Sequence, residues 1–465
     1  MLRLFKQYYS IRNIFFVFGE ALAIYVSVLL SYWILIGRVY IPIDLWLLLK
    51  TFLIIFVTQA CLYFNDLYDL NITGTFSELG IRLFQSIGAA SIILAGVYYI
   101  FPEAMIGRGV FIVSIVFIIL LIVSWRFCYM LVLKHKILDQ KIMLLGSGEL
   151  IQNITNEINN SIDCGYTVSI NIPEPTGNIY LSNTKGAGII TREGSDNLCE
   201  IAKKFEIKKI IVALQEKRGM FPINELLKCR VNGIDILEGT SFYEMLTGKL
   251  IVRQINPAWL IFSKGFYKSN IRRFLKRTTD LVLCIFGLVL LLPLIILISI
   301  LIKIDSRGPV IFSQERVGEN RKIYRVHKFR SMIVDAEKQS GPVWAKDDDK
   351  RITRVGRFIR KLRIDEIPQL LNVLKGNMSF VGPRPERDFF IKKLEETIPY
   401  YGERFTVKPG ITGWAQVCYG YGASVEDAVE KLNYDLFYIK NMSTFMDLMI
   451  IMRTIKTVLF GKGAR

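Results

Sequence analysis

Histidine is almost absent from this sequence of 465 residues, in which only His135 and His327 occur. A catalytic triad or a multi-histidine metal site therefore lacks the residues that it needs, and any chemistry must come from carboxylates and cations. The seven cysteines are scattered without a Cys-x-x-Cys pair. The sequence thus signals neither a disulfide framework nor a zinc site.

Negative charge is also in short supply. The chain has 59 Lys and Arg against 41 Asp and Glu, a net charge of +18, and 52% of its residues are hydrophobic. This composition is too apolar for a wholly soluble protein. Nucleic acid, anionic lipid and phosphorylated substrates would all attract a cationic chain, but the apolar segments favour lipid and phosphate, so we expect no nucleic-acid partner.

Four long apolar stretches occupy the N-terminal third, at about residues 14–36, 45–64, 83–101 and 110–133. Each is near the ~20 residues that a helix needs to cross a bilayer, so residues 1–139 are predicted to form a four-helix membrane domain. The first stretch is too long for a signal peptide and is expected to be retained. Basic residues precede the first stretch and follow the fourth, at Lys134 and Lys136, which places both ends in the cytoplasm.

The pattern changes at about Gln140 to strands that alternate with helices, beginning with the strand KIMLLG. We therefore predict a central Rossmann-like, parallel α/β domain over residues 140–255. Gly146 and Gly148 follow this strand, as in a dinucleotide fingerprint, but Ile151 takes the place of the third glycine. We interpret the domain as a relic of a nucleotide fold that serves structure, assembly or regulation.

Another apolar segment follows a linker predicted at residues 256–275. Residues 281–302 are apolar throughout, with Pro293 near the middle. Their length alone predicts a fifth transmembrane helix with a tolerated proline kink. Basic residues flank both ends, however, as in a segment that enters and leaves the same membrane face. We favour a re-entrant helix-break-helix hairpin over about residues 279–303, broken at Pro293.

Recognisable motifs lie downstream: QERVG from Gln314, KFRSM from Lys328, DDDKRITRVGRFIRKLRIDEIPQLLNVLKGNMSFVGPRP from Asp347 and KPGITGWAQV from Lys408. On these motifs, the region from Lys276 to the C-terminus resembles the bacterial sugar transferase family, the monotopic phosphoglycosyl transferases. The whole chain is similar to the large polyprenyl glycosylphosphotransferases of exopolysaccharide biosynthesis. EMLTGKL and PAWLIFSKGF are similar to members associated with exosortase systems.

The resemblance implies a C-terminal monotopic catalytic domain over residues 276–465, with a mostly helical α/β fold. Such a domain transfers a sugar-1-phosphate from a UDP-sugar to undecaprenyl phosphate and releases UMP, the initiating step of exopolysaccharide or capsule synthesis. By the same resemblance, Asp365 is the nucleophile that forms a covalent aspartyl-phosphosugar intermediate, and Glu366 with Asp365 holds Mg²⁺. The implied location is the bacterial inner membrane, with the catalytic domain on its cytoplasmic face.

The chemistry of Asp365 and Glu366 fits that role. The pair follows a stretch with several cations, so both carboxylates are expected to stay ionised. A carboxylate can attack phosphorus and divide one transfer into two steps. Repulsion between the carboxylate and a diphosphate is the main obstacle, which Mg²⁺ and arginine side chains lower. An isolated Asp-Glu pair would otherwise be a solvated helix start.

Further residues are candidates for binding phosphates or nucleotide. Pro383 and Pro385 make the loop around Arg384 rigid, which suits bidentate binding of a diphosphate, although a surface turn is the alternative. Gly410 permits a close approach of backbone to ligand. The substrate-binding set, which depends largely on the resemblance, is Arg330, Arg351, Pro383, Arg384, Pro385, Lys408, Gly410, Thr412 and Gln416.

The last apolar segment, STFMDLMIIMRTIKTVLF, has helical spacing with interspersed cations. It is predicted to be an in-plane interfacial helix, with an ordinary core helix as the alternative. In either case, we expect the active site to lie at the level of the lipid headgroups. We also expect membrane lipid as a partner and a second copy of the chain in a homodimer.

Three other functions stay open. Asp347 and Asp349 form a D-x-D, as in metal-dependent glycosyltransferases, which would release UDP. A nucleotide-sugar dehydratase needs a Tyr-x-x-x-Lys pair, but the instance at Tyr324 and Lys328 is far from the glycine motif. A non-enzymatic scaffold of a polysaccharide assembly complex would use the membrane and α/β domains alone.

Overall fold

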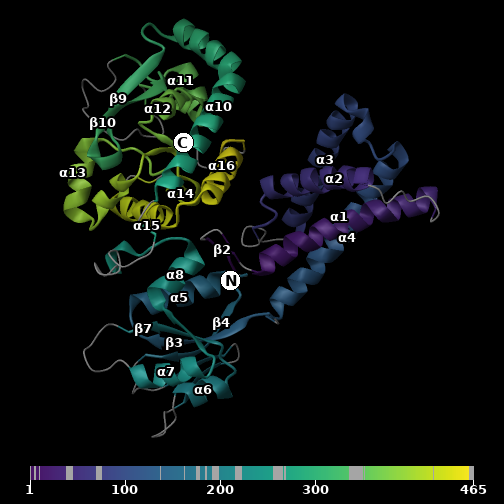
Figure 1. The fold of residues 1–465 in the computed structure, drawn as a ribbon, viewed down its shortest axis with the longest axis vertical. Helices are drawn as coiled ribbons and strands as arrows, with labels where there is room; N and C mark the ends of the chain where they lie inside the picture. Colours follow the sequence, from purple (N-terminus) through teal and green to yellow (C-terminus); the bar gives the residue numbers. More distant parts are fainter. Residues whose placement is uncertain are drawn as a thin grey trace. The chain divides into compact units, whose positions relative to one another are not determined.

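Two compact units make up this computed structural model (Figure 1). Unit 1 comprises Met1–Arg3 and Tyr8–Phe242, and unit 2 comprises Leu4–Gln7 and Tyr243–Arg465. The short strands β1 (Leu2–Leu4) and β2 (Gln7–Tyr9) lie at the N-terminus. The structure describes residues 2–4, 7–9, 11–37, 45–69, 76–136, 138–161, 163–173, 179–183, 186–190, 198–214, 222–254, 265–266, 269–334, 349, 351–420, 422 and 424–459.

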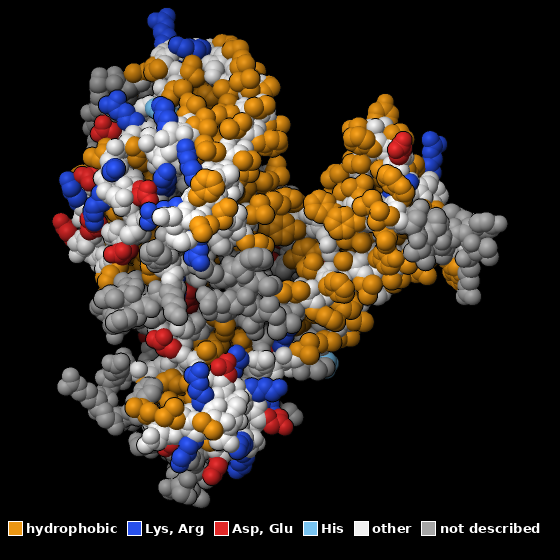
Figure 2. All heavy atoms as spheres, viewed as in Figure 1, with side chains coloured by type: hydrophobic (Ala, Val, Ile, Leu, Met, Phe, Trp, Pro, Cys, Tyr) orange, Lys and Arg blue, Asp and Glu red, His pale blue; other side chains and the backbone are white. Residues whose placement is uncertain are grey.

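Long apolar helices open unit 1: α1 (Ile11–Ile36), α2 (Leu45–Phe64), α3 (Phe76–Ile100) and α4 (Arg108–Lys134), with the short η2 (Pro102–Ala104) before α4. By length and composition, each of the four could cross a membrane, and so could α10 of unit 2. Figure 2 shows hydrophobic side chains gathered over the surfaces of these helices. The chain is therefore a membrane-associated protein, and the N-terminal apolar helices are confirmed.

Helix α3 begins earlier than its apolar stretch predicts. It starts at Phe76, whereas the prediction starts at residue 83. Its first turns contain Glu78 and Arg82, whose side chains form an ion pair one helical turn apart at 2.5 Å. Because such pairs stabilise a helix, the polar turns extend α3 beyond its apolar part.

An ion pair is buried among these helices. Arg126 Nη2 of α4 lies 2.6 Å from Glu20 Oε1 of α1, and the two side chains are 2% and 0% exposed. Arg126 Nη1 also donates a hydrogen bond to the Leu67 carbonyl oxygen at 2.9 Å. Since a buried charge needs a partner, the pair ties α1 to α4.

A six-stranded sheet follows, with the order β6-β5-β4-β3-β7-β8. The strands are β3 (Gln140–Gly146), β4 (Tyr166–Ile172), β5 (Ile179–Asn183), β6 (Gly186–Ile190), β7 (Lys209–Ala213) and β8 (Asp235–Glu238). The helices are α5 (Glu149–Asn160), α6 (Leu198–Lys204), α7 (Ile223–Val231) and α8 (Gly239–Thr247). Strands β4, β3, β7 and β8 are parallel, as predicted for an α/β domain. Antiparallel β5 and β6 were not predicted.

Gly146, the last residue of β3, and Gly148, just after the strand, both have positive φ angles. Gly146 has φ of +132°, and a Cβ there would lie 2.4 Å from the carbonyl oxygen of Ala213 in β7. Gly148 is the N-cap of α5. Close packing of β3 against β7 thus explains Gly146 without a ligand, in agreement with a structural role for the motif.

Unit 2 is mostly helical, with two pairs of short strands among the described residues. Its helices are α10 (Asn270–Asp305), α11 (Arg354–Lys361), α12 (Gln369–Lys375), α13 (Asp388–Thr397), α14 (Trp414–Cys418), α15 (Val425–Asn441) and α16 (Thr444–Leu459). Strands β9 (Ile311–Val317) and β10 (Ile323–Phe329) pair antiparallel, and β11 (Ser379–Val381) pairs parallel with β12 (Gly410–Thr412). Short 3-10 helices are η3 (Val252–Gln254), η4 (Glu319–Arg321), η5 (Ile364–Glu366) and η6 (Tyr401–Thr406).

Helix α10 continues through Pro293, so the helix break predicted at this residue is not seen. Its ribbon changes direction along its length instead (Figure 1). Proline lacks the N–H that would continue the helical ladder, and it clashes with the preceding turn, which bends a helix without ending it. Both halves of α10 pack on unit 2: Cys284 lies in a core cluster with Leu370 of α12, and Ile298 lies in one with Ile359 of α11. The re-entrant path stays a prediction.

Unit 2 also takes up residues 243–254, which we predicted as part of the central domain. Leu250 and Val252 are buried in its main hydrophobic core. Trp414 Nε1 donates to the Gly248 carbonyl oxygen at 2.8 Å, and the Leu250 N–H donates to the Asn433 carbonyl oxygen at 3.1 Å. Helix α10 begins inside the predicted linker, because Ser269 caps it by accepting from the Arg272 N–H. Residues 255–264, 267 and 268 of the linker region lie outside the described residues.

Candidate active site

The carboxylate pair Asp365 and Glu366 lies in η5, between α11 and α12 of unit 2. Arg363, the N-cap of η5, has φ of 54°, in the left-handed region. This turn ends the cationic helix and places the two carboxylates before Pro368, which precedes α12. The predicted pair is therefore on a tight turn with a helix on each side.

Two cations hold Glu366. Lys328 Nζ of β10 lies 2.7 Å from Glu366 Oε1, and Arg384 Nη2 lies 2.9 Å from the same oxygen. Burial alone would raise the pKa of Glu366, but the charges of Arg384 and Lys328 outweigh burial and lower it. Glu366 is therefore a carboxylate that stays ionised, as its cationic neighbourhood predicts.

Asp365 has a different environment from its neighbour. It is partly buried, and among the described residues its carboxylate has no hydrogen-bond or ion-pair partner. Burial raises the pKa of Asp365, and the negative charge of Glu366 raises it further. The positive charge of Lys328 lowers it but does not outweigh burial. The sequence predicts two similar ionised groups, whereas the structure separates a paired carboxylate from an unpaired one.

The loop that carries Arg384 is built by two parallel strands. The Gly382 N–H donates to the Thr412 carbonyl oxygen, and the Gly410 N–H donates to the Pro383 carbonyl oxygen, both at 2.9 Å. A Cβ at Gly410 would lie 2.1 Å from the Gly382 nitrogen, so this approach requires glycine. The Gly-Pro-Arg-Pro loop and the KPGITGW motif are far apart in the sequence and are brought together by the parallel pairing of β11 with β12.

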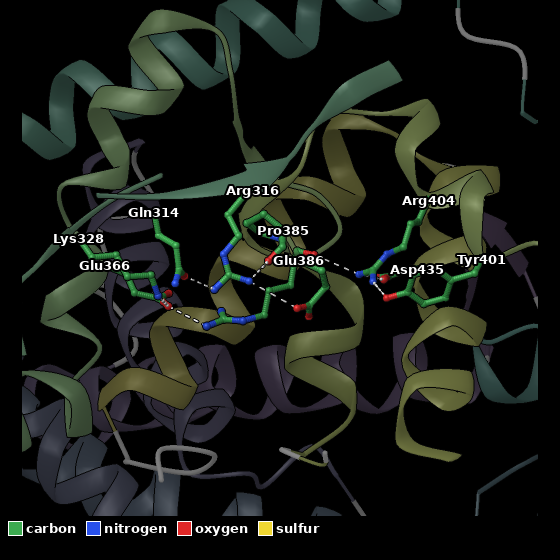
Figure 3. A network of polar contacts seen from close by, with 10 residues as sticks. Gln314, Arg316, Lys328, Glu366, Pro385, Glu386, Tyr401, Arg404 and Asp435 are labelled. Carbon is green, nitrogen blue, oxygen red and sulfur yellow. Dashed lines mark hydrogen bonds and ion pairs between the residues drawn. The ribbon is translucent and has the colours of Figure 1, made fainter. Parts of the chain in front are cut away.

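A polar network extends from Glu366 through the loop (Figure 3). Arg316 of β9 lies 3.3 Å from the Pro385 carbonyl oxygen, to which it donates, and 3.5 Å from Glu386 Oε2. At the far end, Arg404 Nη2 donates to the Arg384 carbonyl oxygen at 3.1 Å and to Asp435 Oδ2 at 2.8 Å. The main chain of the Pro-Arg-Pro loop is therefore held by two arginines while the Arg384 side chain reaches Glu366.

A cavity of about 170 Å³ begins beside the carboxylates. Its wall is mostly apolar, with Arg363 and Glu366 among the polar exceptions. The lining residues come from α10, η5 and its flanks, α12, β11, β12, α14 and α16: Gly287, Leu291, Arg363, Glu366, Ile367, Leu370, Phe380, Ile411, Thr412, Gln416, Val417, Thr454, Thr457 and Val458. Of the predicted substrate-binding residues, Thr412 and Gln416 lie here.

Three other predicted binding residues have contacts elsewhere. Arg330 is 5% exposed, and its Nη2 donates to the Ser306 carbonyl oxygen at 2.7 Å, just after the end of α10. Lys408 lies near Gly376, after α12, whereas Asp365 and Glu366 precede that helix. Arg351 binds Asp349 with Nε and Nη2, at 2.8 and 2.6 Å. Their roles in substrate binding stay predictions.

Sequence reasoning missed Lys328, Arg316 and Arg404 as site residues. Lys328 belongs to the KFRSM motif, from which Arg330 was selected instead. Arg316 could have been found from the QERVG motif, to which it belongs. It lies on β9, the strand that pairs with β10. For Arg404 no local signal exists, since its partners Asp435 and Arg384 are distant in sequence.

The two carboxylates beside the cavity suit one kind of Mg²⁺ site. Among the described residues, no group of three or more His, Cys, Asp or Glu side chains could hold a metal ion. Mg²⁺, however, commonly binds one or two carboxylates together with substrate phosphates and water. The unpaired Asp365 and the adjacent Glu366 meet this requirement, so the residues fit an ion that arrives with a diphosphate rather than one in an all-protein cage.

Comparison with known proteins agrees with these motifs. The bacterial sugar transferase model matches residues 271–461, and a CoA-binding domain model matches residues 63–237. A UDP-N-acetylgalactosamine-undecaprenyl-phosphate N-acetylgalactosaminephosphotransferase of Aeromonas hydrophila is 43% identical over 240 residues, 52% of this chain and 56% of that protein. An undecaprenyl-phosphate glucose phosphotransferase of Komagataeibacter xylinus is 43% identical over 194 residues, 41% of this chain and 36% of that protein.

A shorter relative is matched along almost its whole length. The exopolysaccharide production protein PSS of Rhizobium leguminosarum bv. phaseoli is 41% identical over 195 residues, 41% of this chain and 98% of that protein. By contrast, the chain spans about half of the Aeromonas protein and less of the Komagataeibacter protein. The region matched by the family model, residues 271–461, contains the carboxylate pair and the Pro-Arg-Pro loop. The chain belongs to the bacterial sugar transferase family.

Proposed function

We propose that the protein transfers a sugar-1-phosphate from a UDP-sugar to undecaprenyl phosphate through a covalent intermediate on Asp365. The observation that supports this proposal is the difference in pairing between the two carboxylates. Glu366 forms ion pairs with Lys328 and Arg384, whereas Asp365 has no partner among the described residues. The names of the relatives from Aeromonas and Komagataeibacter, both undecaprenyl-phosphate sugar phosphotransferases, support the reaction class.

The first step is nucleophilic attack on the donor. A carboxylate oxygen of Asp365 forms a bond to the phosphorus that carries the sugar, and the bond from that phosphorus to the bridging oxygen breaks, so UMP leaves with the electron pair. Lys328 and Arg384 form ion pairs with Glu366, the neighbour of Asp365. Their positive charges would stabilise the oxygens of the diphosphate. Attack needs the ionised form of Asp365.

The second step regenerates the enzyme. A phosphate oxygen of undecaprenyl phosphate attacks the phosphorus of the aspartyl-phosphosugar, and the bond to Asp365 breaks, which returns the carboxylate and forms the lipid diphosphosugar. When bound, Mg²⁺ supplies positive charge that lowers repulsion between the carboxylate and the diphosphate, and Asp365 and Glu366 would hold it.

The membrane elements are suited to a lipid substrate. Helix α10 exposes a run of hydrophobic side chains, including Val282, Ile285 and Phe286. We propose that it enters and leaves the cytoplasmic face of the bacterial inner membrane, and that α16 lies in the interface beside it. Transfer there would start an exopolysaccharide or capsule. Association with an exosortase system and formation of a homodimer stay predictions.

The metal-dependent glycosyltransferase alternative has less support. Asp349 is held by both Nε and Nη2 of Arg351, which lowers the pKa of that carboxyl to about 2. Arg351 meets both oxygens of Asp349, whereas Lys328 and Arg384 meet the same oxygen of Glu366, so Asp349 is the less suited of the two to hold a metal. Asp347, the other member of the D-x-D, lies outside the described residues.

The test uses the purified full chain with Mg²⁺, undecaprenyl phosphate and a panel of UDP-sugars. UMP and UDP release are followed for the parent, for Asp365→Asn and for the control Asp388→Asn, a substitution at an exposed site on α13. We expect UMP release with one donor, no release after Asp365→Asn, and full activity after Asp388→Asn. Mass spectrometry of the donor-treated parent should find a phosphosugar on Asp365. Release of UDP, or full activity of Asp365→Asn, would contradict the mechanism.

A further inference from the structure

The donor step proposed above assigns no role to the apolar part of the cavity beside the carboxylates. We propose that it holds the isoprene unit nearest the phosphate of the acceptor lipid, with the phosphate at the end formed by Arg363 and Glu366. This inference rests on the proposed function, in which the acceptor is a polyprenyl phosphate. It adds the part of the protein that recognises the lipid chain.

The size of the cavity fits one such unit. An apolar cavity of about 150 Å³ in a protein core can hold a benzene molecule. The cavity here is about 170 Å³. An isoprene unit has five carbons, one fewer than benzene, so it fits together with the start of the next unit. Burial of these carbons would contribute roughly 0.8 kcal/mol for each methylene-sized group.

The polar groups in the wall leave little for a polar ligand to bind. The Thr412 and Thr454 hydroxyls bond each other at 2.6 Å, and the Thr457 hydroxyl donates to the Arg453 carbonyl oxygen at 2.9 Å. Because these hydroxyls already have partners, the cavity between α10 and α16 favours an apolar occupant. Gln416 is the exception: its Nε2 donates to the Ile411 carbonyl oxygen at 3.3 Å, whereas its Oε1 is buried with no hydrogen-bond partner among the described residues.

Charged residues in an otherwise mostly apolar wall indicate an amphiphile. Arg363 and Glu366 are among the lining residues, and Arg384 and Lys328 lie within 3 Å of Glu366. An occupant with an apolar chain and an anionic head would place the head beside these cations and next to Asp365. A wholly apolar molecule would not use them. The phosphate of the acceptor would thereby lie beside Arg363 and Glu366, next to Asp365, where the second transfer step takes place.

The cavity wall on α10 is open because residue 287 is glycine. A Cβ at Gly287 would lie 3.7 Å from Leu370 Cδ1, an ordinary contact, so a larger residue there meets free space before it meets other atoms. The helix also tolerates the change, since leucine favours a helix over glycine. Gly287→Leu should therefore fill the cavity without unfolding α10.

Two cavity variants from different helices and one control test the proposal. The variants are Gly287→Leu on α10 and Thr457→Leu on α16, and the control is Val282→Phe, which enlarges an α10 residue that is 62% exposed and lies outside the cavity. Farnesyl phosphate serves as a short prenyl acceptor, and dodecyl phosphate as an unbranched acceptor of the same main-chain length. The donor step is measured separately, as the UMP released in one turnover without acceptor.

We expect both cavity variants to raise the KM for farnesyl phosphate by about tenfold or more, with the UMP burst of the parent retained. The parent should prefer farnesyl over dodecyl phosphate, and the variants should lose that preference. Val282→Phe should behave as the parent does. An unchanged KM with an intact burst, or an equal rise in the control, would overturn the inference alone. Absence of a UMP burst in the parent would overturn the proposed function, and this inference with it.

Discussion

Arg404 donates a hydrogen bond to the main-chain carbonyl oxygen of Arg384 across 3.1 Å. The side chain of Arg384 in turn lies 2.9 Å from Glu366, beside the proposed nucleophile. Arg404 is itself held by Asp435 at 2.8 Å and is 7% exposed. Arg404 is thus a buried arginine that touches no reacting atom but holds the main chain of Arg384 in place.

Arg404 should act as a positioning residue through Arg384. We expect Arg404→Lys to lower kcat/KM by about tenfold or more, because lysine cannot replace the planar fork of an arginine. The same change in an Arg384→Ala background should have almost no further effect. Steady-state kinetics of the four proteins measure this coupling, with Arg321→Lys, at an exposed ion pair to Glu395, as the control. Independent, multiplying losses would contradict the prediction.

Metal dependence should depend on Glu366. Chelation of Mg²⁺ is expected to abolish transfer, and added Mg²⁺ to restore it. Glu366→Gln removes a negative charge that would hold the ion, so we expect roughly a tenfold or greater increase in the Mg²⁺ concentration needed for half-maximal activity. Titration of Mg²⁺ against UMP release measures it. An unchanged Mg²⁺ requirement would show that Glu366 serves only to position Lys328 and Arg384.

Protonation of Asp435 should stabilise the folded protein. Burial raises the pKa of Asp435 to about 6, although Arg404 acts in the opposite direction. An unfolded chain protonates aspartate near ~3.9. Between these values the folded state binds a proton that the unfolded state does not, so this contribution to stability grows as the pH falls from about 6 to about 4.

The matched comparison is Asp435→Asn. As the pH falls through this window, we expect the free energy of unfolding of the parent to rise relative to that of the variant by on the order of 1 to 3 kcal/mol. The melting temperature of the parent should rise relative to that of the variant accordingly. Thermal unfolding in detergent at a series of pH values measures the difference. Parallel curves for parent and variant would contradict the raised pKa.

The ion pair between Glu20 and Arg126 should stabilise the helices of unit 1. Arg126→Leu leaves Glu20 buried without its partner, so we expect a loss of about 3 to 5 kcal/mol. Replacement of both residues by leucine should recover most of that loss, since neither charge is then buried. Thermal unfolding of the full chain in detergent compares the variants. A double variant less stable than either single one would show that the pair has a role beyond mutual neutralisation.

Local patterns in the sequence were sufficient for the apolar helices, for the parallel strands of the α/β domain and for family membership. Runs of apolar residues predict helices because each residue of a spanning helix meets lipid or another helix. Asp365, Glu366 and Arg384 were found in the same way, from motifs whose residues are close in sequence. The antiparallel strands β5 and β6 were missed, since a short hairpin at a sheet edge has little periodicity.

Tertiary structure decided which cation serves which carboxylate. Lys328 and Arg330 are two residues apart, yet Lys328 reaches Glu366 across 38 positions of sequence, whereas Arg330 binds Ser306 after the end of α10. In a strand, residues two apart lie on the same face, but β10 ends at Phe329, between Lys328 and Arg330. The alternation of side chains along a strand therefore could not predict where both side chains lie. Motif membership alone could not distinguish the two.

The sequence by itself determined that this protein has apolar helices, an α/β domain and a bacterial sugar transferase region with a carboxylate pair, because each of these is written in neighbouring residues. Only the tertiary structure decided that Glu366 is paired while Asp365 is not, and that Gly287 and Thr457 line one cavity. These relationships depend on how α10, η5 and α16 pack. Packing brings together residues that are far apart in the chain, and no local periodicity records those contacts.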